Sequence, residues 1–385
     1  MKNKSYQTGM TLIEIMIALL IGVFLLGGVI NIFINSKQTY RMQEGLSRLQ
    51  ENGRFAMEFL AKDIRLAGFM GCSSVTATNP VVIANNPLVA PNPHLGIPAP
   101  AVVQASTITG GDNNIQNNPG PPPTGSFASP SPALSTSPLN GVLVGTDAIT
   151  VQFGESCGGY SSAATTSVNP TGIIAAGNTC GINLGTGATF ATIGTPLIIS
   201  DCSSAHVFRA SAGTSQNKDA VPAGAGAATS ILIGKAAPGY AAGSEIMLFR
   251  SYTYFLQLGA SGQPALWRLD NNKPVLAGSN PEELIEGIEN MQTTYGVDTD
   301  AAGAVGSGTP NYYVSANNVA AADWPKVVSI RISLLAATVD DNLTAQPVPY
   351  TYNGVTTTTT SVPPVTDRRI RRVFNTTIAI RNRLP

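Results

Sequence analysis

The segment that decides the fold reads Gly9-Met10-Thr11-Leu12-Ile13-Glu14, and an almost unbroken apolar run follows it as far as Ile34. The 25 residues from Met10 to Ile34 are enough to cross the roughly 30 Å hydrocarbon layer of a bilayer as a tilted helix. A carboxylate in such a segment is costly to desolvate, so Glu14 is expected to be functional. Lys2 and Lys4 precede the run, which places the first residues in the cytoplasm by the positive-inside rule.

This N-terminus differs from a secretory signal peptide, which has a shorter apolar region followed by a small-residue cleavage site. Here the small residue, Gly9, comes before the apolar run, and no such site follows it. The order of a basic leader, Gly9, a short polar step, Glu14 and a long apolar helix resembles the class III prepilin signal. The alternative is a simple signal anchor with a Glu near one end.

The resemblance implies a leader peptide of residues 1–9 and a transmembrane assembly helix of residues 10–34. In the family, a prepilin peptidase cleaves after the Gly on the cytoplasmic side and N-methylates the new first residue. Carried over to this chain, cleavage falls between Gly9 and Met10, Met10 is methylated, and Glu14 becomes the fifth mature residue. The family usually has Phe where this chain has Met10.

Beyond Ile34 polar and charged residues appear in the sequence, but apolar residues still recur every three or four positions. This pattern predicts an amphipathic helix over residues 35–71. The stretch from Met10 to Ala67 is 58 residues, or about 87 Å if it is continuously helical. Gly68 and Gly71 are expected to end it, since Gly is the usual helix terminator. The apolar face is predicted to carry Met42, Leu46, Leu49, Gly53, Ala56, Leu60, Ile64 and Ala67. The solvent-exposed face is predicted to carry Arg41, Glu44, Arg48, Glu51, Glu58, Lys62 and Arg65.

Sequence blocks in this second half of the helix and near the C-terminus resemble the PilW-type minor pilins of type IV pili. Two blocks are ENGRFA at residues 51–56 and DIRLAGF at residues 63–69, and the others lie within 283–298 and 371–383. About residues 73–240 carry no recognised block. Arg54 and Arg65 are expected to be solvated or to pack on the head, with a subunit contact as the alternative.

The composition favours an exported, β-rich head over residues 72–385. Charged residues make up only 11% of the 385, and Gly and Pro are abundant at 39 and 27. The formal net charge is zero, so neither nucleic acid nor an acidic membrane surface is the expected main partner. Residues 73–140 are rich in Asn, Pro, Ala, Ser and Gly, which predicts loop with a few short strands.

The four cysteines are candidates for disulfides in a translocated domain, and four cysteines permit three pairings. We expect Cys157–Cys180, which closes a short loop, and Cys72–Cys202, which ties the helix end to the core. The sequence contains no C-x-x-C and only two histidines, so a zinc site is not expected.

Short β signals begin near residue 148 and continue to the C-terminus. A helix is predicted at residues 280–285, because Asn280 is a good N-cap, Pro281 follows it and acids fill the first turn. Stretches near 299–318 and 341–365 are predicted to be loops. The predicted strands are 148–153, 196–200, 231–233, 246–249, a hairpin of 251–258 with 265–269, 291–297, 328–334 and 372–381.

The search for catalytic motifs favours a non-enzymatic protein without a cofactor. The sequence has no Walker A loop, H-E-x-x-H or G-x-S-x-G. The residues 298–303 match an EF-hand loop only at Asp298, Asp300 and Gly303, so a turn is preferred to a calcium site. An arginine cluster near the C-terminus is expected to point outward and pair with Glu282, Glu283, Glu286 and Glu289, with a partner patch or DNA as alternatives; its members are Arg368, Arg369, Arg371, Arg372, Arg381 and Arg383.

Together these observations predict an α+β fold in which a long N-terminal pilin helix packs on a β-rich periplasmic head. The family resemblance implies an inner-membrane minor pilin whose Glu14 pairs with the α-amino group of Met10 of its own or a neighbouring subunit. The implied partners are other minor pilins, the major pilin, the prepilin peptidase and the inner-membrane pilus assembly machinery. The alternatives are a minor pseudopilin of type II secretion, a pilus-tip adhesin and a signal-anchored periplasmic enzyme.

Overall fold

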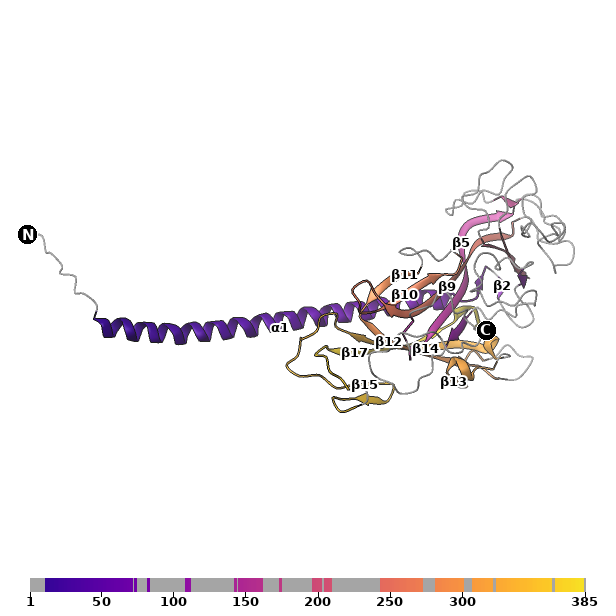
Figure 1. Ribbon diagram of the computed structural model, residues 1–385. Coiled ribbons are helices and arrows are strands. Elements are labelled where there is room, and N and C mark those ends of the chain that lie inside the picture. Colours follow the sequence, from indigo (N-terminus) through magenta and orange to yellow (C-terminus); the bar gives the residue numbers. More distant parts are fainter. Residues whose placement is uncertain are drawn as a thin grey trace, which may run out of the picture.

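The computed structural model shows one long helix that carries a β-rich head at its C-terminal end (Figure 1). It describes residues 11–71, 73–74, 82–83, 108–111, 142–143, 145–161, 173–174, 196–202, 204–209, 243–272, 281–300, 307–320, 323–361 and 364–383. The predicted strand at 231–233 lies outside the described residues. The α+β class predicted from the sequence is confirmed.

Helix α1 (Leu12–Leu66) is a single helix of 55 residues, as the continuous apolar period predicts. Thr11 is its N-cap, and the helix ends because Ala67 adopts an extended conformation and Gly68 a positive φ of 77°. The chain then leaves the helix directly into the head, where the Gly68 amide donates to the carbonyl of Gln152 at 2.9 Å. The side chain of Asn382 donates to the carbonyl of Ala67 at 3.2 Å and so caps the free helix end.

The strands of the described residues form two main sheets and two small hairpins (Figure 1). The larger sheet follows the order β11-β10-β9-β7-β8-β3, and β5 joins it by pairing with β9, β4 and β6. Its strands are β3 (Val82–Ile83), β4 (Ile108–Gly111), β5 (Ala148–Ser161), β6 (Ile173–Ile174), β7 (Pro196–Asp201), β8 (Ser204–Arg209), β9 (Glu245–Leu258), β10 (Pro264–Asp270) and β11 (Glu282–Glu286).

The smaller sheet is wholly antiparallel and has the order β13-β12-β14-β17. Its strands are β12 (Ile288–Val297), β13 (Tyr312–Val314), β14 (Val327–Ala337) and β17 (Arg371–Ala379). The hairpins are β1 (Phe69–Met70) with β2 (Ser73–Ser74) and β15 (Tyr350–Tyr352) with β16 (Val355–Thr357), and three short 3-10 helices are η1 (Ala316–Asn318), η2 (Trp324–Lys326) and η3 (Arg381–Arg383).

The helix predicted at residues 280–285 is wrong, because this segment forms the edge strand β11. The strand pairs with β10 and buries Ile285, and Arg268 Nε donates to Glu282 Oε1 at 2.7 Å. These long-range contacts outweigh the local N-cap and proline signals. The stretches predicted to be loops near 299–318 and 341–365 likewise contain the short strands β13, β15 and β16.

The core lies between the two sheets and the second half of α1. Leu60 and Ile64 of the helix are fully buried against Tyr254 of the larger sheet and Ile330 of the smaller one, in one apolar cluster. Leu49, Gly53, Ala56 and Ala67 are also buried, as the apolar period predicts. Burying an aliphatic side chain of this size contributes about 1.5–3 kcal/mol, so this stripe fixes the head on the helix.

Two glycines bring the helix close to the head. A Cβ at Gly53 would overlap the ring of Phe374 in β17, and a Cβ at Gly45 would come within 2.8 Å of Leu343 Cδ1. Phe374 packs against the core cluster, so the helix backbone rests almost directly on β17. Such close approach is a common reason for Gly inside a helix, where Gly otherwise costs about 1 kcal/mol relative to Ala.

A buried hydrogen bond reinforces this junction. The Tyr254 hydroxyl donates to Asp63 Oδ2 at 2.5 Å, and Asp63 is only 6% exposed. Burial raises the pKa of the Asp63 carboxyl, although the bond from Tyr254 and the charge of Arg268 act in the opposite direction. Burial, with the neighbouring Asp63 charge, also raises the pKa of Tyr254, so the hydroxyl remains a donor. The sequence analysis did not single out Asp63.

Gly53→Leu should lower the stability of the head by about 1–3 kcal/mol, because the new side chain displaces the Phe374 ring. Thermal unfolding of the full chain in detergent, followed by circular dichroism, measures the change. Gln50→Leu on the exposed side of the helix is the matched control. The double variant with Phe374→Ala should recover part of the loss. Equal losses for Gly53→Leu and Gln50→Leu would rule out the close contact.

Asp63→Asn should change how stability depends on pH. Because the folded-state pKa of Asp63 is raised, this group stabilises the fold below its ordinary pKa of 3.8, and that contribution is lost as pH rises through the raised pKa. The unfolding temperature of the wild type should therefore fall, relative to Asp63→Asn, as pH rises above about 4. Tyr254→Phe removes the donor that lowers this pKa and should move the transition to higher pH; an unmoved transition would contradict the assignment.

Candidate functional site

The first turn of α1 fixes the position of Glu14. The Thr11 amide and hydroxyl both donate to Glu14 Oε2 at 3.2 Å, and the Glu14 amide donates to Thr11 Oγ1 at 3.4 Å. This reciprocal arrangement is a capping box, which satisfies backbone donors that a helix start leaves free. It holds the carboxylate beside the helix N-terminus, where the helix dipole also favours a negative charge. Gly9 and Met10 lie outside the described residues.

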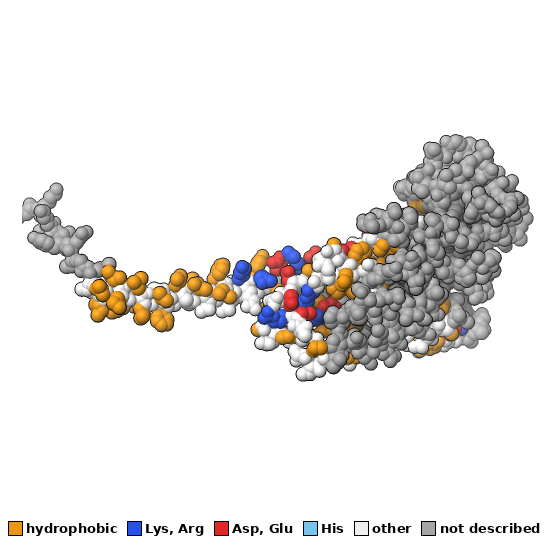
Figure 2. Space-filling view, in the orientation of Figure 1, with side chains coloured by type: hydrophobic (Ala, Val, Ile, Leu, Met, Phe, Trp, Pro, Cys, Tyr) orange, Lys and Arg blue, Asp and Glu red, His pale blue; other side chains and the backbone are white. Residues whose placement is uncertain are grey.

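The first half of α1 projects beyond the described part of the head and exposes its apolar side chains, some of which are visible in Figure 2. The helix is long and apolar enough to cross a membrane, and its most apolar stretch is not buried inside the protein. A shallow apolar depression of about 370 Å³ lies on the surface of this half, lined by Ile15, Ala18, Leu19, Gly22, Val23 and Leu26. A helix with such a surface requires either lipid or other apolar helices around it.

The arginines near the C-terminus only partly follow the prediction that they point outward and pair with the four glutamates. Arg371 is instead nearly buried, at 7% exposure, and lies between two carboxylates. Its Nε donates to Glu289 Oε2 at 2.6 Å and its Nη2 to Asp367 Oδ2 at 2.6 Å. Burial by itself would raise the pKa of Asp367, but the hydrogen bonds and charge of Arg371 lower it below the ordinary value.

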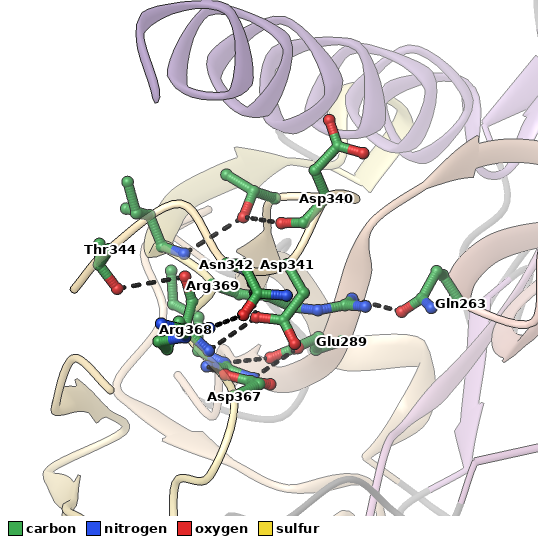
Figure 3. Close-up of polar contacts among 12 residues, drawn as sticks. Gln263, Glu289, Asp340, Asp341, Asn342, Thr344, Asp367, Arg368 and Arg369 are labelled. Carbon is green, nitrogen blue, oxygen red and sulfur yellow. Dashed lines mark hydrogen bonds and ion pairs between the residues drawn. The ribbon is translucent and has the colours of Figure 1, made fainter. Parts of the chain in front are cut away.

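The guanidinium groups of the neighbouring Arg368 and Arg369 bond amide side chains rather than carboxylates (Figure 3). The Arg368 amide donates to Asp341 Oδ1 at 2.8 Å, and its guanidinium bonds Asn342. The guanidinium of Arg369 donates to Gln263 in the β9–β10 turn. Glu282 pairs with Arg268, which the prediction did not name. The network therefore fixes the segment before β17 and withdraws Arg369 and Arg371 from the open surface, while Arg368, Arg372 and Arg381 remain exposed.

The loop that partly matches an EF-hand uses its carboxylates to bind backbone amides. Asp298 Oδ2 accepts from the Gly308 amide at 2.8 Å, and Asp298 Oδ1 accepts from the Asp300 amide at 3.1 Å. Asn311 accepts from Thr299 and donates to Asp300 across the same loop. This is the turn chemistry expected from the sequence. Within the described residues no group of His, Cys, Asp and Glu is arranged to hold a metal ion.

Cys202 is disulfide-bonded and follows β7. Cys72 and Cys180 lie outside the described residues, and only the backbone of Cys157, within β5, is described. The pairings Cys72–Cys202 and Cys157–Cys180 remain predictions. Arg54 and Arg65 are exposed on α1, as expected for solvated positions.

Two parts of the chain match family models. Residues 4–30 match the prokaryotic N-terminal methylation motif, and residues 253–382 match the type IV pilus-assembly protein W family. The second match begins within β9 and covers the smaller sheet and the arginine network. No curated protein and no solved structure matches the chain at a significant level.

Both matched families are structural proteins of pilus assembly rather than known enzymes. The N-terminal motif agrees with the apolar helix and with the capping box of Glu14, and it implies interaction with a prepilin peptidase and with pilus components in general. The two matches confirm the resemblance drawn from the sequence and support a PilW-type minor pilin with a role in type IV pilus assembly.

Proposed function

We propose that the protein is an inner-membrane minor pilin that takes part in the priming or tip complex of a type IV pilus. The single observation that carries this proposal is the division of α1. Its first half is apolar, carries one carboxylate at its start and exposes its side chains, while its second half is built into the described part of the head. The first half is therefore available both to the bilayer and to other subunits.

The proposed cleavage between Gly9 and Met10 would leave a new α-amino group four residues before Glu14. Thr11 would then be the second residue, so the capping box holds the carboxylate close to this terminus. Among the described residues, Thr11 is the hydrogen-bond donor to this carboxylate. In an assembly, the α-amino group of a methylated Met10, from the same or a neighbouring subunit, would supply the opposite charge, and such a pair is strongly favoured where water is scarce.

The size and shape of the head favour a position at the tip or in a priming complex. The head, residues 72–385, makes up most of the chain. A subunit of the shaft has to fit a helical lattice on all sides, whereas a subunit at the end has neighbours on one side only. The head would lie in the periplasm before assembly, where disulfides can form.

We further propose that Cys72 is the disulfide partner of Cys202. A Cβ at Gly71 would come within 3.2 Å of the Ser200 side chain, so the chain passes β7 immediately before Cys72. Mass spectrometry of unreduced peptides tests this pairing, and a link from Cys202 to either of the other two cysteines would exclude it.

Deletion of the gene, with surface pili and secreted enzymes scored in the same strain, tests the proposed function. Loss of pili with normal secretion is the expected outcome. Normal pili with blocked secretion would instead assign the protein to a type II secretion machine, in which the helix and Glu14 could have the same roles. Normal pili and normal secretion would refute the proposal.

Glu14→Val should leave membrane insertion and leader cleavage intact but reduce incorporation into sheared pili by more than about tenfold, because an uncompensated α-amino charge remains. Glu14→Gln is the matched control, because Gln also completes a capping box but carries no charge. Both variants should fail equally if charge pairing matters, and normal incorporation of Glu14→Gln would contradict that role. A bulky residue in place of Gly9 should leave the leader uncut, as seen by mass.

A further inference from the structure

Strand β17 forms a long edge of the smaller sheet. It is the last strand in the order β13-β12-β14-β17 and has nine residues, whereas the edge strands β3, β4, β6, β11 and β13 have five at most. Strand β11 is also partly covered by α1, since Asn52 Nδ2 donates to the carbonyl of Glu286. Of the edge strands that the structure describes, β17 is therefore the longest.

The bonds between β17 and β14 show which backbone groups face outward. The register between the two strands is unbroken, and the Ile380 amide donates to the carbonyl of Val328 at 2.9 Å. Because bonded positions alternate in an antiparallel pair, the even-numbered residues of β17 bond β14 and the odd-numbered ones direct N–H and C=O away from the sheet. Within the described part of the chain no hydrogen bond reaches these outward groups. They belong to Val373, Asn375, Thr377 and Ala379.

This edge lacks the features that usually keep an edge strand from pairing. Natural edge strands carry charges, prolines or bulges, because an open row of donors and acceptors pairs readily with another strand. From Val373 to Ala379 the sequence has no charge, proline or glycine, and the pairing with β14 has no bulge. Asn375, Thr377 and Ala379 are exposed. Such an edge is suited to the addition of an extended segment from outside the sheet.

The direction of β17 excludes an antiparallel pair of two β17 strands. Phe374, near the start of the strand, lies against Gly53, and Asn382, just after its end, donates to the carbonyl of Ala67. Strand and helix therefore run in the same direction. An antiparallel pair would turn the helix of the second copy end for end, which two copies anchored in one membrane cannot do.

Charge opposes a parallel pair of two β17 strands. Arg372 lies near one end of the edge, Arg381 lies just beyond the other, and both are exposed. A parallel pair in register would place each arginine beside its own copy, and like charges directly opposite each other are destabilising. A second β17 is therefore a poor partner in either direction.

The charges around the edge favour an acidic partner. The exposed Arg331 of β14 lies opposite Thr377 and adds to the positive charge of Arg372 and Arg381. At the start of β17 the exposed Arg368 is balanced by the exposed Asp340. On the flank of α1 that adjoins β17 the exposed charges also balance, with Arg54 and Arg65 against Glu51 and Glu58. The arginine network contributes one surplus acid, since Arg369 and Arg371 lie among Glu289, Asp341 and Asp367. A positive surplus remains.

We infer that β17 binds an extended segment of a different protein, which adds to the four-stranded smaller sheet as a fifth strand. The centre of this segment is uncharged, and Asp or Glu near its ends lies opposite Arg372 and Arg381. Backbone pairing holds the segment, and its acids select it. The inference rests on the proposed function, because membrane anchoring sets the common direction of the helices. It adds to that function a class of partner and the strand that receives it.

Photo-crosslinking in the native strain identifies what covers this edge. Benzoylphenylalanine replaces Asn375 or Thr377 in the full chain, and Tyr312, which is 39% exposed on the opposite edge of the same sheet, is the control position. Positions 375 and 377 should both give an adduct with one other protein, through a segment that carries acids, and position 312 should not give it. An adduct of two copies of this chain, or no adduct, would overturn the inference.

Proline at position 377 tests whether the contact is backbone pairing. Thr377→Pro removes an outward N–H and leaves the bonds to β14 in place. It should lower the yield of the adduct at position 375 about tenfold, whereas Thr377→Ala, which keeps the N–H, should not. Equal yields for the two variants would contradict strand addition. If Thr377→Pro unfolds at a lower temperature in detergent, Arg372→Glu decides: it should lower the yield, and Arg372→Lys should not.

The outcomes separate this inference from the proposed function. If deletion abolishes pili while the adduct is absent or insensitive to these variants, strand addition is wrong and the proposed function stands. If deletion leaves pili and secretion unchanged, the proposed function fails, and the crosslinks alone decide whether β17 receives an added strand.

Discussion

Ala56, Leu60 and Ile64 of α1 are fully buried between the two sheets, and the rest of the structure depends on this contact. The smaller sheet touches the helix through Phe374, and the larger sheet through Tyr254, so the helix is the element that both sheets share. Without it each sheet would expose an apolar face. The second half of the helix is thus part of the core of the head, and the first half extends away from the head (Figure 1).

A close backbone approach and several hydrogen bonds make the contact between α1 and the sheets specific as well as strong. Gly53 allows the helix to rest on β17, Asp63 accepts from Tyr254, and Asn52 Nδ2 donates to the carbonyl of Glu286 at 3.0 Å. Apolar packing alone tolerates small rotations of a helix about its axis, whereas hydrogen bonds at fixed positions do not. The cap from Asn382 adds a further fixed point at the helix end. These contacts therefore fix the orientation of the head about the helix axis.

Secondary-structure elements with a strong hydrophobic periodicity could be predicted from the sequence. Contacts between residues that are far apart in the chain could not. The apolar period of α1 and the strand over residues 328–334 were predicted correctly, because burial on one face imposes a regular sequence pattern on each. The error at residues 280–285 arose because capping signals are local, while pairing of β11 with β10 depends on chain that is not adjacent. Asp63 carried a usable signal, as an acid next to the apolar Ile64 on the buried face, but Tyr254 lies 191 residues away. The burial of Arg371 was missed because Arg368, Arg369 and Arg372 around it resemble an exposed cluster.

The rigidity of the junction has a consequence for any assembly that includes this protein. Helix α1 is continuous from Leu12 to Leu66, so a rotation of the helix among other helices turns the head by the same angle. Neighbours that hold the apolar half of the helix would thereby fix the direction in which the head points. The same continuous helix therefore links the packing of its apolar half to the direction in which the head is presented.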